Sequence, residues 1–385
     1  MTNEQSDSIL NMPLDTLEQA VLEQVHEFLN DAAVTCASNK PRYKAKPKLN
    51  VWSPDIKLAL DEIRKYYAQW LKNLATPEES TVLENRQYYQ KVEYDIGLIT
   101  EIVKDKNIQP ATLEELQKAI KSFNKGKSAD IYEITVEHIL HAGKNLEWFL
   151  LNLISIIFKK GKVPEMLKEG LLTPVGITVL PVLNKVIETI VKVRINPAVL
   201  VTQNVTQQGF TAGSGPANAA LPVEEIYRKA KDNNQEYELV LLDAKSAFDV
   251  VIHSHLMKRL YHAGIDDKHW TIIQSMHTDA TSAVKWNGQT SELFNVLQGV
   301  RQGGILSTDL YKLYINPLLN MLETSNLACR IGNILCNTSA CADDVALISK
   351  KTTDMQVQIN MANTFAGMEG YKLQPKKKHG YKHQT

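Results

Sequence analysis

The stretch Glu238-Leu-Val-Leu-Leu-Asp243-Ala-Lys-Ser-Ala-Phe248-Asp249 places an apolar run directly before a carboxylate. Such a short aliphatic run predicts a buried β-strand. The stretch Cys341-Ala342-Asp343-Asp344-Val-Ala-Leu-Ile-Ser349 likewise joins an acidic pair to an apolar run. An acidic side chain beside a buried strand is costly unless a cation coordinates it. The two stretches are therefore candidates for one site at the ends of two strands.

Three carboxylates, Asp243, Asp343 and Asp344, would converge if these two strands are neighbours. Such a set holds two hard divalent ions about 3.5–4 Å apart, which activate a 3′ hydroxyl and stabilise a pyrophosphate leaving group. The alternative is that the three residues are acids of surface turns, and the residues alone leave both interpretations open. The pair Asp266-Asp267 offers an internal comparison, because it lies between two expected helices and we interpret it as a helix cap.

A glycine-rich segment, Gln298-Gly-Val-Arg-Gln302-Gly-Gly-Ile-Leu-Ser307, lies between the two acidic stretches. Glycines permit the backbone to approach a ligand closely. A helix is expected just after them, and its N-terminus could face a phosphate or a sugar–base unit. A plain turn between a strand and a helix is the alternative.

Helices and strands are expected to alternate irregularly along the chain. Thr112 and Glu115 predict a capping box at a helix start, and Trp286-Asn-Gly-Gln289 predicts a tight turn between paired strands. Strands joined by short turns favour an α+β fold over a doubly wound one. Helices are expected at 14–29, 54–71, 78–104, 112–123, 132–142, 146–160, 182–194, 217–230, 252–263, 304–323 and 353–367. Strands are expected at 170–180, 237–243, 282–287, 293–297 and 345–348.

Composition sets limits on the class of protein. The chain has 385 residues, of which 44% are hydrophobic, enough for a buried core in two or three subdomains. It holds no apolar run of about 18 residues that could span a bilayer, and its N-terminus is polar, so we expect an intracellular protein of the nucleus or the cytoplasm.

The four cysteines lack paired spacing and are expected to be reduced thiols. The formal net charge is zero, so composition gives no sign of a basic groove.

The order of the motifs resembles the reverse transcriptases of non-LTR (LINE-type) retrotransposons. Asp243 with Ala-Phe-Asp comes first, then Gln-Gly-Val-Arg-Gln-Gly-Gly-Ile-Leu-Ser, then Ala-Asp-Asp. Segments at 164–174, 176–188 and 208–211 also look like family segments. The resemblance covers roughly residues 110–377.

This resemblance implies a right-hand polymerase, an α+β fold whose palm has an antiparallel sheet with helices. Residues 1–109 would form a helical N-terminal region with a basic linker, 110–235 partial fingers and 236–385 the palm. Because the sequence stops soon after the palm, no thumb is expected.

The resemblance also implies a role for each matching residue. Asp243, Asp343 and Asp344 would be the catalytic, metal-binding aspartates, and Ala244 would lend a backbone carbonyl to a metal. Phe248 matches the aromatic steric gate that selects deoxynucleotides, although a core aromatic is the alternative.

Three further residues match positions expected to contact the substrate. Gln302 and Gly303 would lie against the incoming nucleotide. Lys377 corresponds to the lysine expected after the Ala-Asp-Asp motif, with a basic tail residue as the alternative.

The expected activity is therefore RNA-directed DNA polymerisation with two Mg²⁺ ions, or Mn²⁺ in their place. The partners would be an RNA template, a DNA primer and deoxynucleotide triphosphates, with no membrane; protein partners are unknown. In this family a basic turn with an arginine normally precedes the glycine at Gly176, and here Val175 adjoins that glycine directly. The alternative is thus an inactive relic, or a domesticated module that binds nucleic acid or protein.

Overall fold

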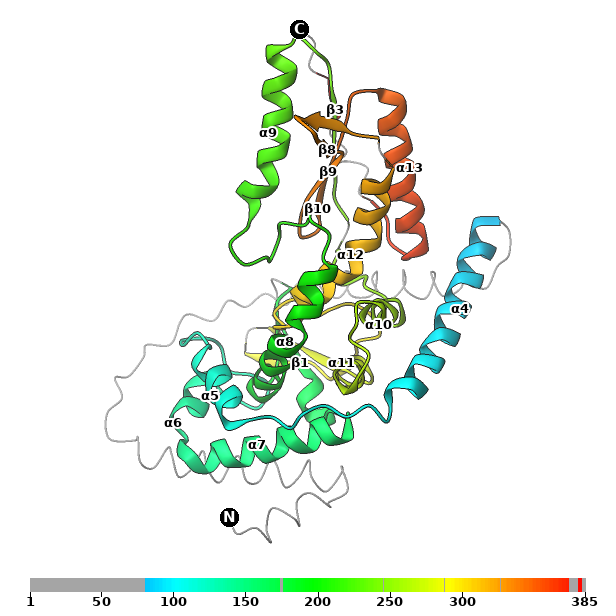
Figure 1. Cartoon of the computed structure of the whole chain (residues 1–385). Coiled ribbons are helices and arrows are strands. Elements are labelled where there is room, and N and C mark those ends of the chain that lie inside the picture. The colour runs from blue at the N-terminus through cyan, green and yellow to red at the C-terminus, as the bar shows by residue number, and fades with distance from the viewer. Residues whose placement is uncertain are drawn as a thin grey trace. The chain divides into compact units, whose positions relative to one another are not determined.

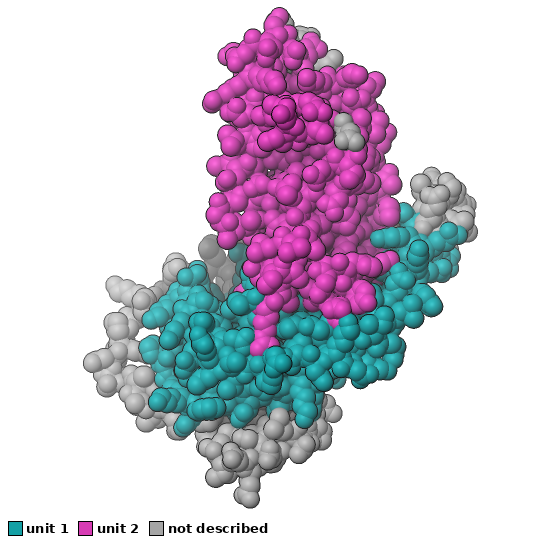
Figure 2. Space-filling view, viewed as in Figure 1, with its two compact units in different colours: residues 1–193, 267–297 teal, residues 194–266, 298–385 magenta. Residues whose placement is uncertain are grey.

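The computed structural model describes residues 80–173, 176–244, 246–286, 288–325, 327–373 and 380–382. The chain divides into two compact units (Figure 2). Unit 1 comprises residues 1–193 and 267–297, and unit 2 comprises residues 194–266 and 298–385. The helices expected at 14–29 and 54–71, like the basic linker, lie outside the described residues.

The helices of unit 1 are α4 (Ser80–Val103), α5 (Leu113–Lys121), α6 (Val136–His141), α7 (Gly143–Lys160), the 3-10 helix η1 (Glu165–Lys168) and α11 (Lys268–His277). Its strands are β1 (Glu169–Leu172), β2 (Thr178–Val179), β4 (Thr281–Trp286), β5 (Gln289–Thr290) and β6 (Phe294–Asn295). Helix α8 (Val182–Thr202) continues along the chain from unit 1 into unit 2.

The sheet of unit 1 has the order β2-β1-β4-β5, with β6 also paired to β4. Strand β1 runs parallel to β4, with Glu169 opposite Thr281. Strand β5 returns antiparallel to β4, with Trp286 opposite Gln289, which confirms the predicted tight turn. Among the helices, α7 packs against α5 and α11. The capping box is also confirmed, because the Thr112 hydroxyl accepts a hydrogen bond from the Glu115 N–H.

The single strand predicted at 170–180 is wrong. Strands β1 and β2 are instead the two arms of a short antiparallel hairpin. The N–H of Thr173 donates to the carbonyl of Ile177 over 2.9 Å, and Gly176 adopts a positive φ of 81°. Glycine takes this conformation without steric cost, so the chain reverses where the apolar run appeared continuous.

The helices of unit 2 are α9 (Pro216–Asp232), α10 (His253–His262), α12 (Ser307–Thr324) and α13 (Thr352–Met368), besides the end of α8. Its strands are β3 (Glu238–Leu242), β7 (Cys329–Ile331), β8 (Ile334–Cys336), β9 (Thr338–Cys341), β10 (Asp344–Ser349) and β11 (Gly380–Lys382). The α+β prediction is confirmed.

A four-stranded antiparallel sheet of order β11-β3-β10-β9 forms the centre of unit 2. Helix α13 packs against β10 and β3, α12 against β9, and α9 against β9 and β7. Figure 1 shows α9 and α13 on opposite sides of the sheet. Residues Val345–Ser349 are all buried because β10 is covered on both faces. This explains why β10 is a continuous apolar run rather than an alternating one.

Several boundaries differ from the prediction. The helix expected at 304–323 begins only at Ser307, because a turn with Gly303 at φ 114° precedes it. The strand expected at 293–297 is reduced to Phe294–Asn295. Strands β7, β8 and β9 were not predicted, since they have only three or four residues each, and α11 was expected only as a helix after Asp266-Asp267, without bounds. In the described part of the chain, no helix has the length and apolar content needed to cross a bilayer.

Candidate functional site

The two acidic stretches meet at one edge of the sheet of unit 2. Strands β3 and β10 are antiparallel neighbours, with Leu242 opposite Val345. One residue further along this register, Asp243 comes opposite Asp344. The expectation that the two strands are neighbours is therefore confirmed, and Asp343 precedes Asp344 in the adjoining turn.

The turn that carries Asp343 is tight. Cys341 and Asp344 are paired across β9 and β10, so Ala342 and Asp343 alone connect the two strands. Ala342 has a positive φ of 61°. Positive φ at the first of two turn residues is typical of a type II′ turn, where glycine is usual because a Cβ costs roughly 1–2 kcal/mol. The backbone beside the acidic pair is thus held in a conformation that this residue does not prefer.

The acidic edge has the donor chemistry that Mg²⁺ and Mn²⁺ require. Asp243 and Asp343 are half-buried and Asp344 is exposed, and their carboxylates are the hard oxygen ligands that such ions prefer. Within the described residues, however, no three His, Cys, Asp or Glu side chains are gathered as a ready metal cage. The residue types fit divalent ions, whereas the side chains of the described residues are not gathered into a set of three ligands.

The negative charge of the acidic edge also affects the pKa of Tyr311, a buried tyrosine of α12. Burial raises the pKa of Tyr311 well above its ordinary value, and the charges of Tyr371, Asp343 and Asp344 raise it further. Tyr311 therefore stays protonated and neutral beside the acidic edge.

Phe248 is held by two other aromatic rings. It stacks on Tyr311 with ring centroids 4.6 Å apart and an interplanar angle of 14°. The ring of Phe210 lies nearly edge-on to the ring of Phe248, with ring centroids 6.3 Å apart and an interplanar angle of 88°. Since Phe248 remains half-buried, its ring is fixed in direction without being enclosed in the core. Ala244, four residues earlier, is buried and forms a backbone bridge with Leu373.

The glycine-rich segment lies directly along the Phe248 loop. The N–H of Gly299 donates to the carbonyl of Val251, and the N–H of Val300 donates to that of Phe248. Gly299 has a φ of 91°, and a Cβ there would lie 2.9 Å from the Asp249 carbonyl oxygen. A side chain would thus be strained and would also clash, which explains this glycine. Gly299 thus permits a close approach of the protein's own backbone, and the expected approach to a ligand stays a prediction.

Three further residues, Gln302, Gly303 and Lys377, were predicted to contact the substrate. Gln302 is half-buried and Gly303 exposed, and both lie in the turn before α12. Lys377 lies outside the described residues. The substrate contacts assigned to all three remain predictions.

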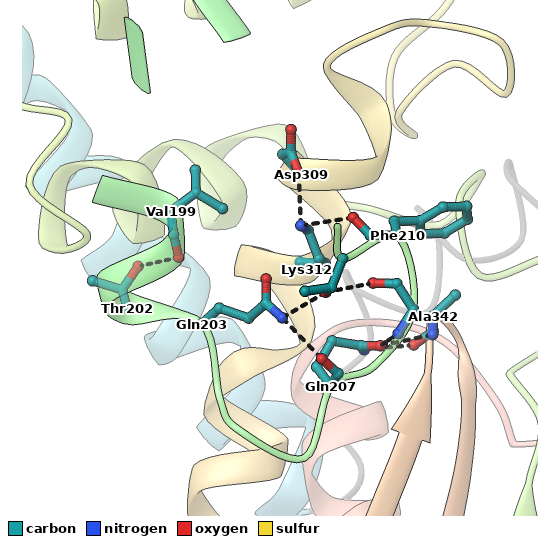
Figure 3. A network of polar contacts seen from close by, with 10 residues as sticks. Val199, Thr202, Gln203, Gln207, Phe210, Asp309, Lys312 and Ala342 are labelled. Carbon is teal, nitrogen blue, oxygen red and sulfur yellow. Dashed lines mark hydrogen bonds and ion pairs between the residues drawn. The ribbon is translucent and has the colours of Figure 1, made fainter. Parts of the chain in front are cut away.

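Sequence reasoning missed the residues that hold the Ala342 turn. Figure 3 shows Gln207 at that turn, with Lys312 between Asp309 and the carbonyl of Phe210. Gln207 precedes a segment that looked like a family segment, but the pattern did not indicate which of the adjacent glutamines turns inward. Lys312 is a buried cation within an apolar helix, a signal that could have singled it out.

Comparisons with known proteins agree with these motifs. The profile of the family described as "Reverse transcriptase (RNA-dependent DNA polymerase)" matches residues 170–385. The chain is 27% identical over 197 residues to the retrovirus-related Pol polyprotein from type-2 retrotransposable element R2DM of Drosophila melanogaster, covering 51% of this chain and 18% of that protein. It is 25% identical over 284 residues to the Pol polyprotein from type-1 retrotransposable element R2 of Popillia japonica, covering 70% and 39%.

A third relative has the highest identity of these three. It is the probable RNA-directed DNA polymerase from transposon X-element of Drosophila melanogaster, 31% identical over 205 residues, with 51% of this chain and 22% of that protein covered. The chain thus spans between 18% and 39% of the length of these relatives. Among solved structures, apo telomerase from Candida tropicalis truncated from its C-terminal domain matches with a TM-score of 0.41 and 15% identity, covering 51% of this chain and 40% of that one.

Proposed function

Because the chain belongs to the reverse transcriptase family, with relatives in non-LTR retrotransposons, we propose that it catalyses RNA-directed DNA synthesis. The observation that carries the proposal is the register of β3 and β10, which brings Asp243 and Asp344 to adjoining strand ends with Asp343 in the turn. Carboxylates on neighbouring strands are the type of ligand that two-metal nucleotidyl transfer needs.

The three aspartates would hold two Mg²⁺ ions, or Mn²⁺ in their place, and the carbonyl of Ala244 would add a further oxygen ligand. When bound, such ions activate the primer hydroxyl and stabilise the pyrophosphate leaving group. The chain's own contribution is to present these oxygens from strand ends, which are more rigid than a free loop.

Phe248 would select the sugar of the incoming nucleotide. A ring fixed by Tyr311 and Phe210 cannot move aside readily, so a 2′ hydroxyl placed against it would clash. Gln302 and Gly303 would contact the nucleotide from the turn before α12. The proposed partners are an RNA template, a DNA primer and deoxynucleotide triphosphates.

Primer extension tests this proposal. Full-length protein is supplied with an RNA template, a labelled DNA primer and deoxynucleotides, first with Mg²⁺ and then with Mn²⁺. We expect incorporation by the wild type and a loss of about a hundredfold or more in Asp343→Ala, by analogy with the removal of a single transition-state contact. Asp266→Ala is the matched control, because it removes an acid from the other Asp-Asp pair of the chain.

The outcomes are distinct. Equal loss in Asp343→Ala and Asp266→Ala would indicate damage to the fold instead of removal of a ligand. Template–primer binding without incorporation by folded wild-type protein at every concentration of either metal would contradict the proposed activity, and would favour a nucleic-acid-binding module that retains the family's fold.

A further inference from the structure

Gln207 makes hydrogen bonds to both polar backbone atoms of Ala342. Its side-chain Oε1 accepts from the N–H of Ala342 over 2.8 Å and from the N–H of Gly209 over 2.9 Å. Its Nε2 donates to the carbonyl of Ala342 over 2.9 Å (Figure 3). The side chain is buried, with 1% of the residue exposed. One amide group thus holds the peptide units on both sides of the residue that has the positive φ.

The backbone around Gln207 reinforces this contact. The N–H of Gln208 donates to the carbonyl of Ala340, and the N–H of Ala340 donates to that of Thr206. A Cβ at Gly209 would lie 2.1 Å from the Ala342 nitrogen, so only glycine permits this approach. Residues 206–209 therefore lie directly along the end of β9, so a displacement of these residues would also displace the Ala342 turn.

Helix α12 in turn holds the segment. The buried Lys312 donates to the carbonyl of Phe210 over 3.2 Å and forms an ion pair with Asp309 at 2.7 Å. The amide of Gln203 donates to the carbonyl of Gln207 over 2.8 Å. The contact of Lys312 connects this segment to α12, the helix that also carries Tyr311, the partner of Phe248.

We propose that Gln207 is a positioning residue for Asp343. By fixing both peptide units of Ala342, it keeps the turn in its unfavoured conformation and so determines where the Asp343 carboxylate points for metal binding. The proposal rests on the proposed function, since it assigns the support of the same site. A metal-binding carboxylate must be held within about 0.5 Å of its productive position, and a misplacement of about 1 Å can cost roughly a hundredfold in rate.

The donor and acceptor pattern makes a sharp variant available. A glutamate at this position retains an acceptor for the two N–H groups, but when ionised it cannot donate to the Ala342 carbonyl. When protonated, it regains that donor. Burial raises the pKa of that carboxyl group, whereas the N–H groups of Ala342 and Gly209, which donate to it, lower the pKa, so the balance of the two effects sets the pH at which the contact returns. A variant that only damages the fold would not show this recovery.

The experiment compares Gln207→Glu with Gln207→Met and with Gln208→Glu as the matched control. Gln208 is the adjacent glutamine, half-buried, and its amide donates to the carbonyl of Val205 instead of the turn. Primer extension is measured between pH 6 and pH 8, and each rate is divided by that of the wild type at the same pH. Thermal unfolding identifies any variant that does not fold.

For Gln207→Glu we expect kcat to fall roughly tenfold to a hundredfold near pH 8, with KM for the deoxynucleotide changed less than about threefold. The ratio to wild type should recover once the pH falls below the pKa of the introduced carboxyl group. For Gln207→Met, which retains the volume without the hydrogen bonds, the loss should be independent of pH. Gln208→Glu should stay within about twofold of the wild type. Rates for both Gln207→Glu and Gln207→Met within about twofold of the wild type, or an equal loss in Gln208→Glu, would overturn the proposal.

Two further measurements do not depend on turnover. Hydrogen exchange of the Ala342 amide should quicken by about tenfold or more in Gln207→Met, since its acceptor is gone. Binding of Mn²⁺, followed by electron paramagnetic resonance, should weaken in the same variant but not in Gln208→Glu. If the wild type incorporates no nucleotide, the proposed function fails, and these two measurements alone decide the inference. Unchanged exchange and unchanged Mn²⁺ affinity would overturn it in either case.

Discussion

The orientation of the Phe248 side chain is fixed by residues that lie far away in the sequence. Its ring is stacked on Tyr311 of α12 and meets Phe210, which follows the Gln207 contact. Aromatic pairs of this geometry contribute about 0.5–1.5 kcal/mol each beyond the area they bury. The ring is therefore held from two sides while one part stays accessible.

This geometry predicts the behaviour of Phe248→Val in the primer-extension assay. With the ring gone, discrimination between a deoxynucleotide and the matching ribonucleotide, measured as the ratio of kcat/KM values, should fall by roughly tenfold or more, about 1.4 kcal/mol. Phe248→Tyr retains the ring and should preserve the ratio. Unchanged discrimination in Phe248→Val would show that Phe248 is a packing residue.

Two Asp-Asp pairs in this chain have different environments. Asp267 is the N-cap of α11, and its carboxylate accepts from the N–H of His269 over 2.9 Å, as the sequence predicted. Asp343 and Asp344 instead lie at a hairpin that leads into the central strand of a sheet. The dipeptide itself carries no information about its role, and the adjoining apolar run distinguishes the two cases.

Helices α10, α12 and α13 are joined by one buried carboxylate at the end of α13. Glu369 accepts a hydrogen bond from His255 over 3.0 Å and pairs with Arg259, both on α10. Arg259 also donates to the carbonyl of Tyr314 on α12, and its guanidinium lies over that residue's ring. Helix α12 packs against both α10 and α13, so the cluster supports the layer that carries Tyr311.

Glu369→Gln should destabilise the protein strongly. Loss of the carboxylate charge leaves the largely buried Arg259 without its counter-ion, and breaking a buried pair in this way costs about 3–5 kcal/mol. The comparison is Glu224→Gln, which breaks the exposed pair with Arg228 and should leave the stability almost unchanged. Urea unfolding at neutral pH measures the free energy of unfolding of both variants. An equally small loss in Glu369→Gln and Glu224→Gln would show that the Glu369 cluster contributes little to stability.

The ion pair of Glu369 with Arg259 also predicts that the stability of the protein depends on pH. Burial alone would raise the pKa of Glu369, but the hydrogen bond from His255 and the charge of Arg259 bring it below its ordinary value of 4.5. Since the folded pKa is the lower one, the stabilisation is fully present above pH 4.5 and is lost as the pH falls through the folded pKa. The stability difference between wild type and Glu369→Gln should therefore narrow in acid.

At the scale of the whole molecule, each unit is assembled from two separate parts of the chain. In unit 1, β1 pairs with β4 from the segment 267–297. In unit 2, β3 pairs with β10 from the segment 298–385. A chain divided after residue 266 therefore loses the strand partners of both units at once.

Separate fragments 1–266 and 267–385 should consequently show no cooperative unfolding transition in urea, whereas the full chain should. Unpaired strands such as β1 and β3 would expose backbone groups and apolar surface that the intact chain buries. Circular dichroism during the titration measures this. A cooperative transition in fragment 1–266 alone would show that its strands are stable without β4 and β10.

Much of the architecture could be read from local patterns. The apolar run before Asp243, the capping box at Thr112 and the turn at 286–289 each depend on neighbouring residues, so the sequence alone predicted them. The break in the apolar run at 170–180 was missed, because the pattern of apolar residues did not reveal that Gly176 reverses the chain.

The sequence by itself determined which residues are the candidates for the chemistry, because the motifs around Asp243, Gln302 and Asp343 are each contiguous and occur in a specific order. Only the tertiary structure decided what holds them. The bond from Gln207 to the Ala342 carbonyl joins residues 135 positions apart, and which buried glutamine reaches that turn depends on the packing of α8, α12 and β9. Local periodicity reports burial and strand direction, whereas a contact over this separation exists only after the sheet and its helices have packed.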